Sequence, residues 1–191
     1  LRVGAAKLTG VSLMRDALSM LDAGAIVALT FNDVGIASTH PGVTVTTAKG
    51  IFNRLAGSKP DVIVAELGDG ILGEYGVQDI LLDAELTRVG AAFIMAAPDP
   101  VACWGAVELM RREFGLPIAA ITGPATDNEV GQVYITNELG LPAHNARRDA
   151  AGLLGVVRTA IAEWTERTER TEKTERTEKT ERSVHSVLPV S

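Results

Sequence analysis

Short apolar runs alternate with amphipathic segments along this chain, and this alternation constrains the fold more than any other feature. The runs "DVIVAEL" at 61–67 and "GAAFIMAA" at 90–97 are almost continuously apolar, which is typical of strands buried on both faces. The segment 47–60 instead repeats apolar residues at helical spacing, at Ala48, Ile51 and Leu55. The alternation predicts βαβ units and therefore an α/β fold, a parallel sheet with helices on both faces.

The same pattern gives the order of the expected elements. Strands are predicted over residues 2–6, 61–67, 90–97 and 116–122. Helices are predicted over residues 11–24, 47–60, 77–88, 100–114 and 129–139, and again after Arg147. We expect these elements to form a single α/β domain over residues 1–164.

The remaining residues, 165–191, differ in kind from this domain. From Thr165 to Arg182 the chain consists of six copies of Thr-Glu-(Arg/Lys). A period of three residues drifts around a helix of about 3.6 residues per turn, so it forms no apolar face. We expect a low-complexity tail without a function of its own, either a solvated helix extension or a disordered segment.

Composition limits the classes of function. No apolar run approaches the roughly 18 residues that span a bilayer, and a net charge of −6 offers no basic stripe for nucleic acid. The single cysteine, Cys103, cannot form an internal disulfide. The sequence favours a cytoplasmic protein that acts on a small molecule, without a nucleic-acid or membrane partner. A second copy of the chain, giving a homodimer, is a candidate partner.

Polar side chains follow the predicted strands, at the edge where α/β proteins bind ligands. Lys7 and Thr9 come after the first strand and, with Gly10, form a candidate anion site. Glu66 ends an apolar strand, and a carboxylate there needs a cation such as Mg²⁺ or hydrogen-bond donors. The alternative is structural: Lys7 extends along the sheet rim, and Glu66 accepts hydrogen bonds from the glycine turn that follows.

A turn-rich loop at 30–42 is the second candidate region. It is long for a spacer inside a compact domain, which favours a binding loop. Asp33, Ser38 and Thr39 are its candidate substrate ligands. The same side chains also favour local turns, so both interpretations remain open.

Two helix starts follow the later strands. "PDP" predicts Asp99 as a helix N-cap with Pro100 in the first turn. Thr126 and Glu129 have the spacing of a capping box, which leaves Asn128 free to meet a ligand.

These strand ends resemble motifs of dethiobiotin synthetase and its relatives, the P-loop ATPases that include cobyrinic acid amidases and septum-positioning ATPases. "AAKLTGV" resembles the Lys-x-x-Ser/Thr-Gly segment after that family's second strand. "VAELGDGILGEYGV" resembles its later strand, whose terminal Glu precedes a glycine-rich loop. "FIMAAPDPVACWGAVELM" and "IAAITGPATDN" stand where its next two strands lie, so the similarity covers residues 2–148 in order.

The resemblance implies a P-loop NTPase-like nucleotide-binding domain of an enzyme that uses ATP and Mg²⁺ on an unknown small molecule. It implies catalytic roles for Lys7 and Thr9, which would face the substrate or the γ-phosphate, Mg²⁺ binding by Glu66, and cofactor binding by Gly68, Gly70 and Asn128, the last near the adenine base.

The chain departs from that family in two ways. No G-x-x-x-x-G-K-(S/T) occurs in its 191 residues, and Leu67 and Asp69 interrupt the family's loop of small residues. The family's first strand and P-loop would lie upstream of Leu1. We therefore expect that the natural chain is longer and that its N-terminal strand and P-loop are absent here.

Two other function classes remain open. Gly68, Gly70 and Gly73 satisfy G-x-G-x-x-G, so a nicotinamide-dependent oxidoreductase would use them for pyrophosphate and Asp99 for the ribose. That class needs a helix to begin at the glycines and an acid roughly 20 residues further on. The third class is a non-catalytic regulatory or scaffold protein on a degenerate nucleotide fold, which predicts no magnesium-dependent turnover.

We predict that the 191-residue chain binds ATP weakly and does not hydrolyse it at a meaningful rate. Phosphate affinity in P-loop proteins comes largely from consecutive backbone N–H groups and a Lys at a helix N-terminus, and this chain lacks that motif. Calorimetry and a phosphate-release assay test the prediction. A dissociation constant of about 1 μM for ATP would contradict it.

Overall fold

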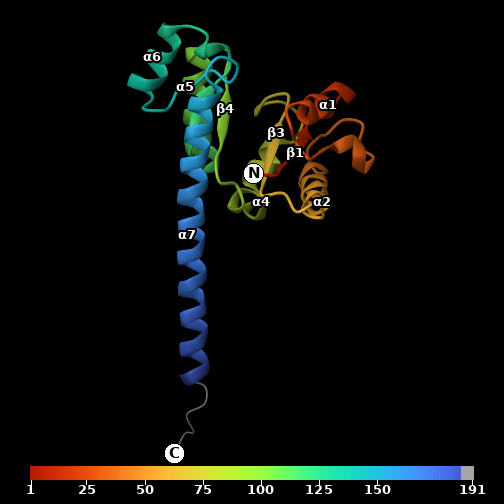
Figure 1. Ribbon diagram of the computed structural model, residues 1–191, viewed down its shortest axis with the longest axis vertical. Helices are drawn as coiled ribbons and strands as arrows, with labels where there is room; N and C mark the ends of the chain where they lie inside the picture. The colour runs from red at the N-terminus through yellow and green to blue at the C-terminus, as the bar shows by residue number, and fades with distance from the viewer. Residues whose placement is uncertain (186–191) are drawn as a thin grey trace, which may run out of the picture. The chain divides into compact units, whose positions relative to one another are not determined.

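The computed structural model describes residues 1–185, with two compact units, 1–89 and 90–191 (Figure 1). Unit 1 contains β1 (Val3–Thr9), α1 (Met14–Asp22), β2 (Val27–Thr30), the 3₁₀ turn η1 (Phe31–Val34), α2 (Thr44–Ala56), β3 (Val62–Leu67), α3 (Val77–Leu82) and α4 (Ala84–Arg88). Unit 2 contains β4 (Ile94–Ala96), α5 (Pro100–Leu109), the π-helical turn η2 (Met110–Phe114), β5 (Ala120–Thr122), the 3₁₀ turn η3 (Pro124–Thr126), α6 (Glu129–Glu138) and α7 (Ala150–His185). The predicted α/β class is confirmed, with parallel strands in both units; that residues 1–164 form one domain stays a prediction.

The sheet of unit 1 has the order β2-β1-β3, and both neighbouring pairs are parallel. Chain connections run outward from β1 to β2 and then back across β1 to β3. Because such crossovers are right-handed, this reversal puts α1 and α2 on opposite faces of the sheet. Figure 1 shows the strands between these two helices, both of which contact β1 and β2.

The core of unit 1 is aliphatic, as the composition indicates. Ala48, Ile51 and Leu55 of α2 are completely buried, which confirms the predicted apolar stripe. They pack with Leu8 of β1 and Phe31 of η1 in one cluster. This cluster fixes the positions of the strands whose ends carry the candidate site.

Two strands differ from the expectation. β1 continues through Thr9, so Lys7 and Thr9 belong to the strand and not to a loop after it. β2 was not predicted, although the apolar run "AIVALTF" that contains it is a usable strand signal. Its last residue is Thr30, so the turn-rich loop begins at Phe31, with the turn η1, and ends before Thr44.

The helix predicted over residues 77–88 is interrupted. Asp83 separates α3 from α4 with an extended backbone, and its carboxylate accepts hydrogen bonds from the N–H groups of Glu85 and Leu86. This capping arrangement starts a new helix, because a short acid competes well for free N–H groups at a helix start.

Unit 2 has a two-stranded parallel sheet of β4 and β5. Its fully buried side chains include Cys103 of α5, Ile121 of β5 and Ile135 of α6. Burial, and then the nearby Asp99, raise the pKa of the Cys103 thiol. The prediction that Cys103 is a packed small side chain is therefore confirmed.

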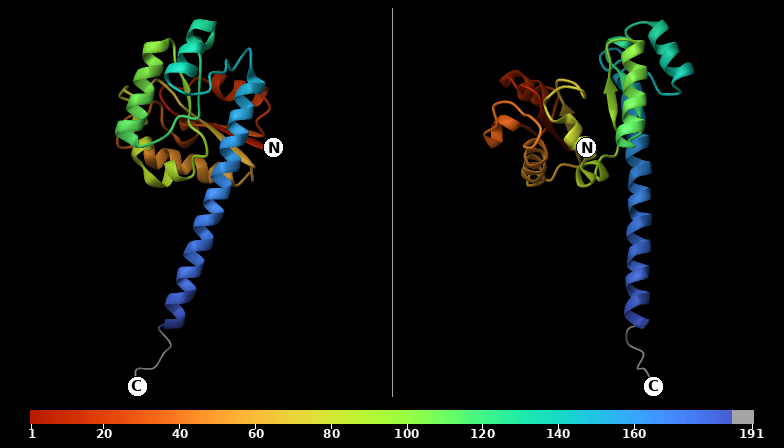
Figure 2. Two further views of the ribbon diagram at one scale, coloured as in Figure 1. Left: turned by 90° about the vertical axis from the view of Figure 1, so that its left-hand side faces the viewer. Right: turned by 180° about the vertical axis from the view of Figure 1, so that it is seen from behind.

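The tail forms a helix as far as the structure describes it. Figures 1 and 2 show α7 as one continuous helix through the repeat, and residues 186–191 lie outside the described part. Threonine hydroxyls of the repeat donate to carbonyls four residues earlier, as from Thr165 to Ile161 and from Thr171 to Arg167. Among the described helices, none is long and apolar enough to cross a membrane.

We predict that deleting residues 165–191 leaves the thermal stability nearly unchanged. The repeat presents no apolar stripe, and threonine lowers helix propensity, so the deleted segment contributes little packing energy. The melting temperature, followed by circular dichroism at 222 nm, should change by less than about 3 °C. A fall of more than several degrees would show that the tail packs on the folded part.

Candidate functional site

The candidate site lies at the carboxyl ends of β1 and β3. In an open α/β sheet with strand order 2-1-3, ligands bind where the connections leave in opposite directions, between β1 and β3. Lys7 pairs in register with Glu66, and after a register shift Thr9 pairs with Leu67. The expectation that Lys7, Thr9 and Glu66 share one edge of the sheet is confirmed.

The Lys7 amine is held between two carboxylates. Its Nζ lies 2.9 Å from Asp16 Oδ2 and 3.8 Å from Glu66 Oε1. The Lys7 side chain is 9% exposed, whereas that of Glu66 is 48% exposed. Lys7 therefore does not extend along the rim into solvent, and Glu66 remains accessible.

Asp16, in the first turn of α1, was not predicted as part of the site. It follows Lys7 by nine residues, and only the rotation of α1 about its axis brings its carboxylate to the amine. The same carboxylate oxygen accepts a hydrogen bond from the Leu13 N–H. An acid in the first turn of the helix after a strand-end lysine was the available signal.

Both members of this ion pair are charged at neutral pH. Burial, the largest single effect, lowers the pKa of Lys7, but the hydrogen bond to Asp16 and the charges of Glu66, Asp16 and Asp69 outweigh it and raise the pKa above its usual value. The hydrogen bond from the Leu13 N–H, and then that from Lys7, hold the pKa of Asp16 below its usual value.

Gly68 allows close packing beside the lysine. A Cβ at this position would lie 2.9 Å from the Thr9 carbonyl oxygen and 3.1 Å from Lys7 Cε. Thr9 is fully buried, and its hydroxyl donates to the Gly68 carbonyl at 3.0 Å. Gly70 has a φ of 85° with open space around it. Thr9 and Gly68 thus join the two strand ends.

Asp69 closes the loop after β1. Its Oδ2 accepts a hydrogen bond from the Val11 N–H at 2.7 Å, and its backbone has a φ of 66°. The side chain occupies the space beside Gly10, where a Cβ would lie 2.8 Å from Asp69 Cγ. The Asp69 carboxylate therefore connects the two loops by accepting a hydrogen bond from the backbone.

The three substrate ligands expected in the 30–42 loop all form hydrogen bonds with the protein backbone. Asp33 Oδ2 accepts from the Thr30 N–H at 2.7 Å and so caps η1. Thr39 is buried, and its hydroxyl accepts from the Gly10 N–H at 2.8 Å. The Ser38 hydroxyl donates to the Gly10 carbonyl. Ser38 and Thr39 hold this loop against the strand end that carries Thr9, whereas Asp33 belongs to the turn itself.

The start of α6 differs from the prediction. Asn128, and not Thr126, is its N-cap, and Asn128 Oδ1 accepts from the Gly131 N–H at 2.9 Å. The Thr126 hydroxyl donates to the Gly123 carbonyl within η3. Asn128 is therefore not free, as the capping-box pattern had suggested, although no hydrogen bond of its Nδ2 amide is recorded among the described residues.

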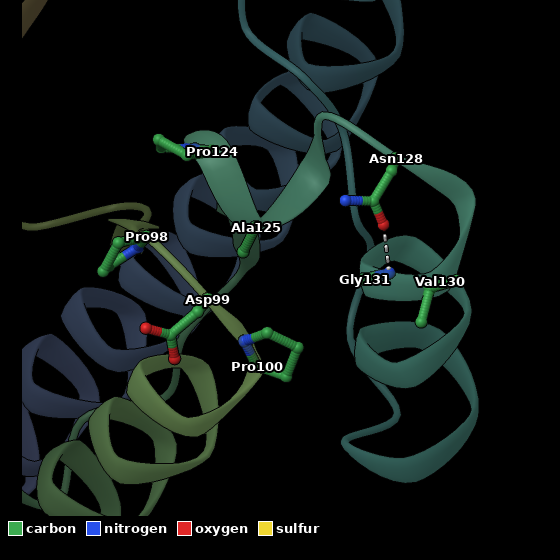
Figure 3. A pocket seen from close by; sticks show the side chains of 8 residues that line it. All are labelled: Pro98, Asp99, Pro100, Pro124, Ala125, Asn128, Val130 and Gly131. Atoms are coloured by element: carbon green, nitrogen blue, oxygen red, sulfur yellow. Dashed lines mark hydrogen bonds between the residues drawn. The ribbon is translucent and has the colours of Figure 1, made fainter.

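Unit 2 has a pocket of about 350 Å³ at the starts of α5 and α6. Asp99 caps α5, as predicted, by accepting from the Ala102 N–H. In Figure 3 the amide nitrogen of Asn128 points toward Ala125, while its oxygen faces Gly131. The lining residues are Pro98, Asp99, Pro100, Pro124, Ala125, Asn128, Val130 and Gly131.

Asn145 fixes the loop beside this pocket and had no signal in the sequence. It is buried, and its Nδ2 donates to Asp127 Oδ1 at 2.8 Å and to the Thr126 hydroxyl. Its Oδ1 accepts from the N–H groups of Arg147 and Arg148. A single amide thereby orders the segments on both sides of α6.

Among the residues whose side chains are described, no group of three or more His, Cys, Asp and Glu is placed to hold a metal ion. Glu66 would therefore supply one ligand to a cation whose other ligands come from water or substrate.

Comparisons with protein-family models, curated proteins and solved structures find no match for this chain.

We predict that Asp16→Asn destabilises the protein at pH 7 and that the loss disappears in acid. The substitution keeps an oxygen for the Leu13 N–H and removes the charge opposite Lys7. Because the pKa of Asp16 is lowered on folding, its contribution is present above the unfolded value of 3.8 and fades as the pH falls through the lower folded value.

Melting temperatures of the wild type and of Asp16→Asn, measured from pH 7 down to about pH 3, test this sign. Glu74→Gln, at an exposed acid of the same unit, is the matched control and should change little at any pH. Equal melting temperatures of the wild type and Asp16→Asn at pH 7 would contradict the ion pair's role.

Proposed function

We propose that unit 1 binds the magnesium complex of a phosphate-bearing ligand, ATP, in an enzyme that resembles dethiobiotin synthetase and acts on a small molecule. The observation that carries the proposal is the buried Lys7 amine, held by two carboxylates at the point where the strand connections diverge. Lys7 supplies a fixed positive charge there, and Glu66 supplies an accessible anionic oxygen.

The charge balance of the site favours a metal complex over a free anion. One lysine faces Asp16, Glu66 and, further away, Asp69, whose charge also acts on it. The surplus of negative charge repels a bare phosphate, whereas a divalent cation at Glu66 reverses the sign locally. Magnesium typically takes only one or two protein carboxylates and completes its shell with water and phosphate oxygens.

The roles proposed for the other residues follow from their contacts. Lys7 would orient a substrate or phosphate oxygen through an N–H that its carboxylates leave unused. Thr9 is fully buried, and by donating to the Gly68 carbonyl it would hold the glycine loop beside the lysine. Gly68 and Gly70 carry no side chain that would cover the lysine.

Unit 2 offers a separate feature that supports nucleotide binding. Its pocket is lined by three prolines and Val130, which suit the flat apolar faces of a purine. Asn128 Nδ2 can donate to a ring nitrogen, while its oxygen is committed to the Gly131 N–H. We therefore propose that Asn128 contacts a purine base bound in this pocket of unit 2.

The nicotinamide alternative lacks an element that it requires. No helix begins at Gly68, Gly70 or Gly73, and α3 starts only at Val77. Pyrophosphate binding of that type depends on the N–H groups and the dipole of a helix beginning at the glycines. The geometry therefore favours the magnesium–phosphate proposal.

We predict that ATP perturbs the amide NMR signals of Gly68 and Gly70 only when Mg²⁺ is present. The titration uses ¹⁵N-labelled chain and ATP up to about 5 mM, because the affinity is expected to be weak. Glu66→Gln should remove the magnesium-dependent shifts by removing the metal's anionic ligand. Glu74→Gln, in the same glycine-rich segment and exposed, should keep them.

Identical shifts with Mg²⁺ and with EDTA would contradict the metal-linked site. Shifts that persist in Glu66→Gln would remove Glu66 from it. Magnesium-dependent shifts confined to residues outside β1, β3 and their loops would place the ligand elsewhere and overturn the proposal for unit 1.

A further inference from the structure

Helix α1 carries an apolar stripe that faces solvent. Met14, Leu18 and Leu21 are 82%, 49% and 41% exposed, and no residue of the helix is buried. Their spacing of four and three residues puts them on one side of the helix. Single exposed apolar residues are common, but a row of three along one short helix marks a contact surface.

The opposite side of α1 is already used by unit 1. Ala17 and Met20 are partly buried there, and α1 contacts β1 and β2. Asp16 also lies on that side and bonds to Lys7. The exposed stripe is therefore a second apolar side of the helix, and it takes no part in covering the sheet.

Two opposite charges flank the stripe on the same edge. Arg15 and Asp22 are seven residues apart, two helical turns, so both lie beside Met14 and Leu18. The Arg15 side chain is 82% exposed, and its Nε lies 3.9 Å from Asp16 Oδ1. Asp22 is exposed as well.

We propose that α1 docks on α1 of a second copy of this chain, antiparallel and around a two-fold axis. An antiparallel pair centred between Leu18 and Ser19 brings Arg15 of each copy opposite Asp22 of the other. The stripe then meets an identical stripe, as an isologous interface requires. The charge pattern is self-complementary in this orientation only, because a parallel two-fold pair would put the two charged edges on opposite sides of the contact, where Arg15 meets no Asp22.

The charged pairs set the register, and the apolar stripe supplies the affinity. One short helix per copy buries little area compared with a standard interface. The dimer is accordingly weak, with a dissociation constant on the order of 10–100 μM. Its contact side excludes Lys7 and Glu66, so association is independent of magnesium and nucleotide.

The test is sedimentation equilibrium of the full chain over a wide concentration range. The wild type should rise from 20.1 kDa toward twice that mass. Met14→Glu should raise the dissociation constant at least about tenfold, because it puts a charge into the apolar stripe that forms the contact. Leu82→Glu, at a leucine of α3 that is 64% exposed, is the matched control and should leave association unchanged.

A charge exchange tests the register itself. Arg15→Glu alone and Asp22→Lys alone should each raise the dissociation constant about tenfold, since each creates two like-charge contacts across the axis. The double variant carrying both changes should return to within about threefold of the wild type. Melting temperatures measured in parallel separate loss of association from loss of folding.

Three outcomes would overturn the proposal. The first is a wild-type chain that stays monomeric up to about 1 mM. The second is a dimer that Met14→Glu and the charge variants leave intact, which would place the contact elsewhere. The third is a large fall in melting temperature for a monomeric Met14→Glu, which would show that another part of the same chain covers the stripe.

Discussion

A protonated amine buried at the end of a parallel strand needs anionic partners close by, and unit 1 is arranged around this requirement. Lys7 obtains them from two elements, Asp16 from α1 and Glu66 from β3. Removing one partner leaves a buried positive charge with insufficient compensation, which is costly. The pair with Asp16 therefore fixes the rotation of α1 on the sheet, and the contact with Glu66 agrees with the register of β1 against β3.

Several other polar side chains at the strand ends form hydrogen bonds with the backbone. Asp33, Asp69 and Asn128 each accept a hydrogen bond from a backbone N–H in a turn or at a helix start. A chain that leaves a strand loses its ladder partners, and short acids and amides replace them. The charged atoms of Lys7 and Glu66 instead pair with charged side chains, which is why they remain the strongest candidates for chemistry.

An element could be predicted from the sequence when the interactions that form it join residues that are close together in the chain. The stripe of α2 could be predicted because its period of 3.6 residues is local, and so could β3, a continuous apolar run. The break at Asp83 could not, since "DAELTR" fits either the interior of a helix or its start. Asp16 could not be assigned to Lys7, because their contact depends on how α1 packs against the sheet. The capping of α6 by Asn128 competed with an equally good pattern two residues earlier.

The two carboxylates around Lys7 differ in their hydrogen bonds and in their exposure to solvent, and so they can have different roles. Asp16 accepts hydrogen bonds from the Leu13 N–H and from the Lys7 amine. Both bonds stabilise the folded structure and keep the pKa of Asp16 low. Glu66 is held only by a contact of 3.8 Å and is half exposed. A cation that binds Glu66 therefore gives up little existing interaction, while Asp16 continues to neutralise the lysine. The metal binding proposed for Glu66 would in this way be separated from the stability of the site, because the two acids differ in exposure.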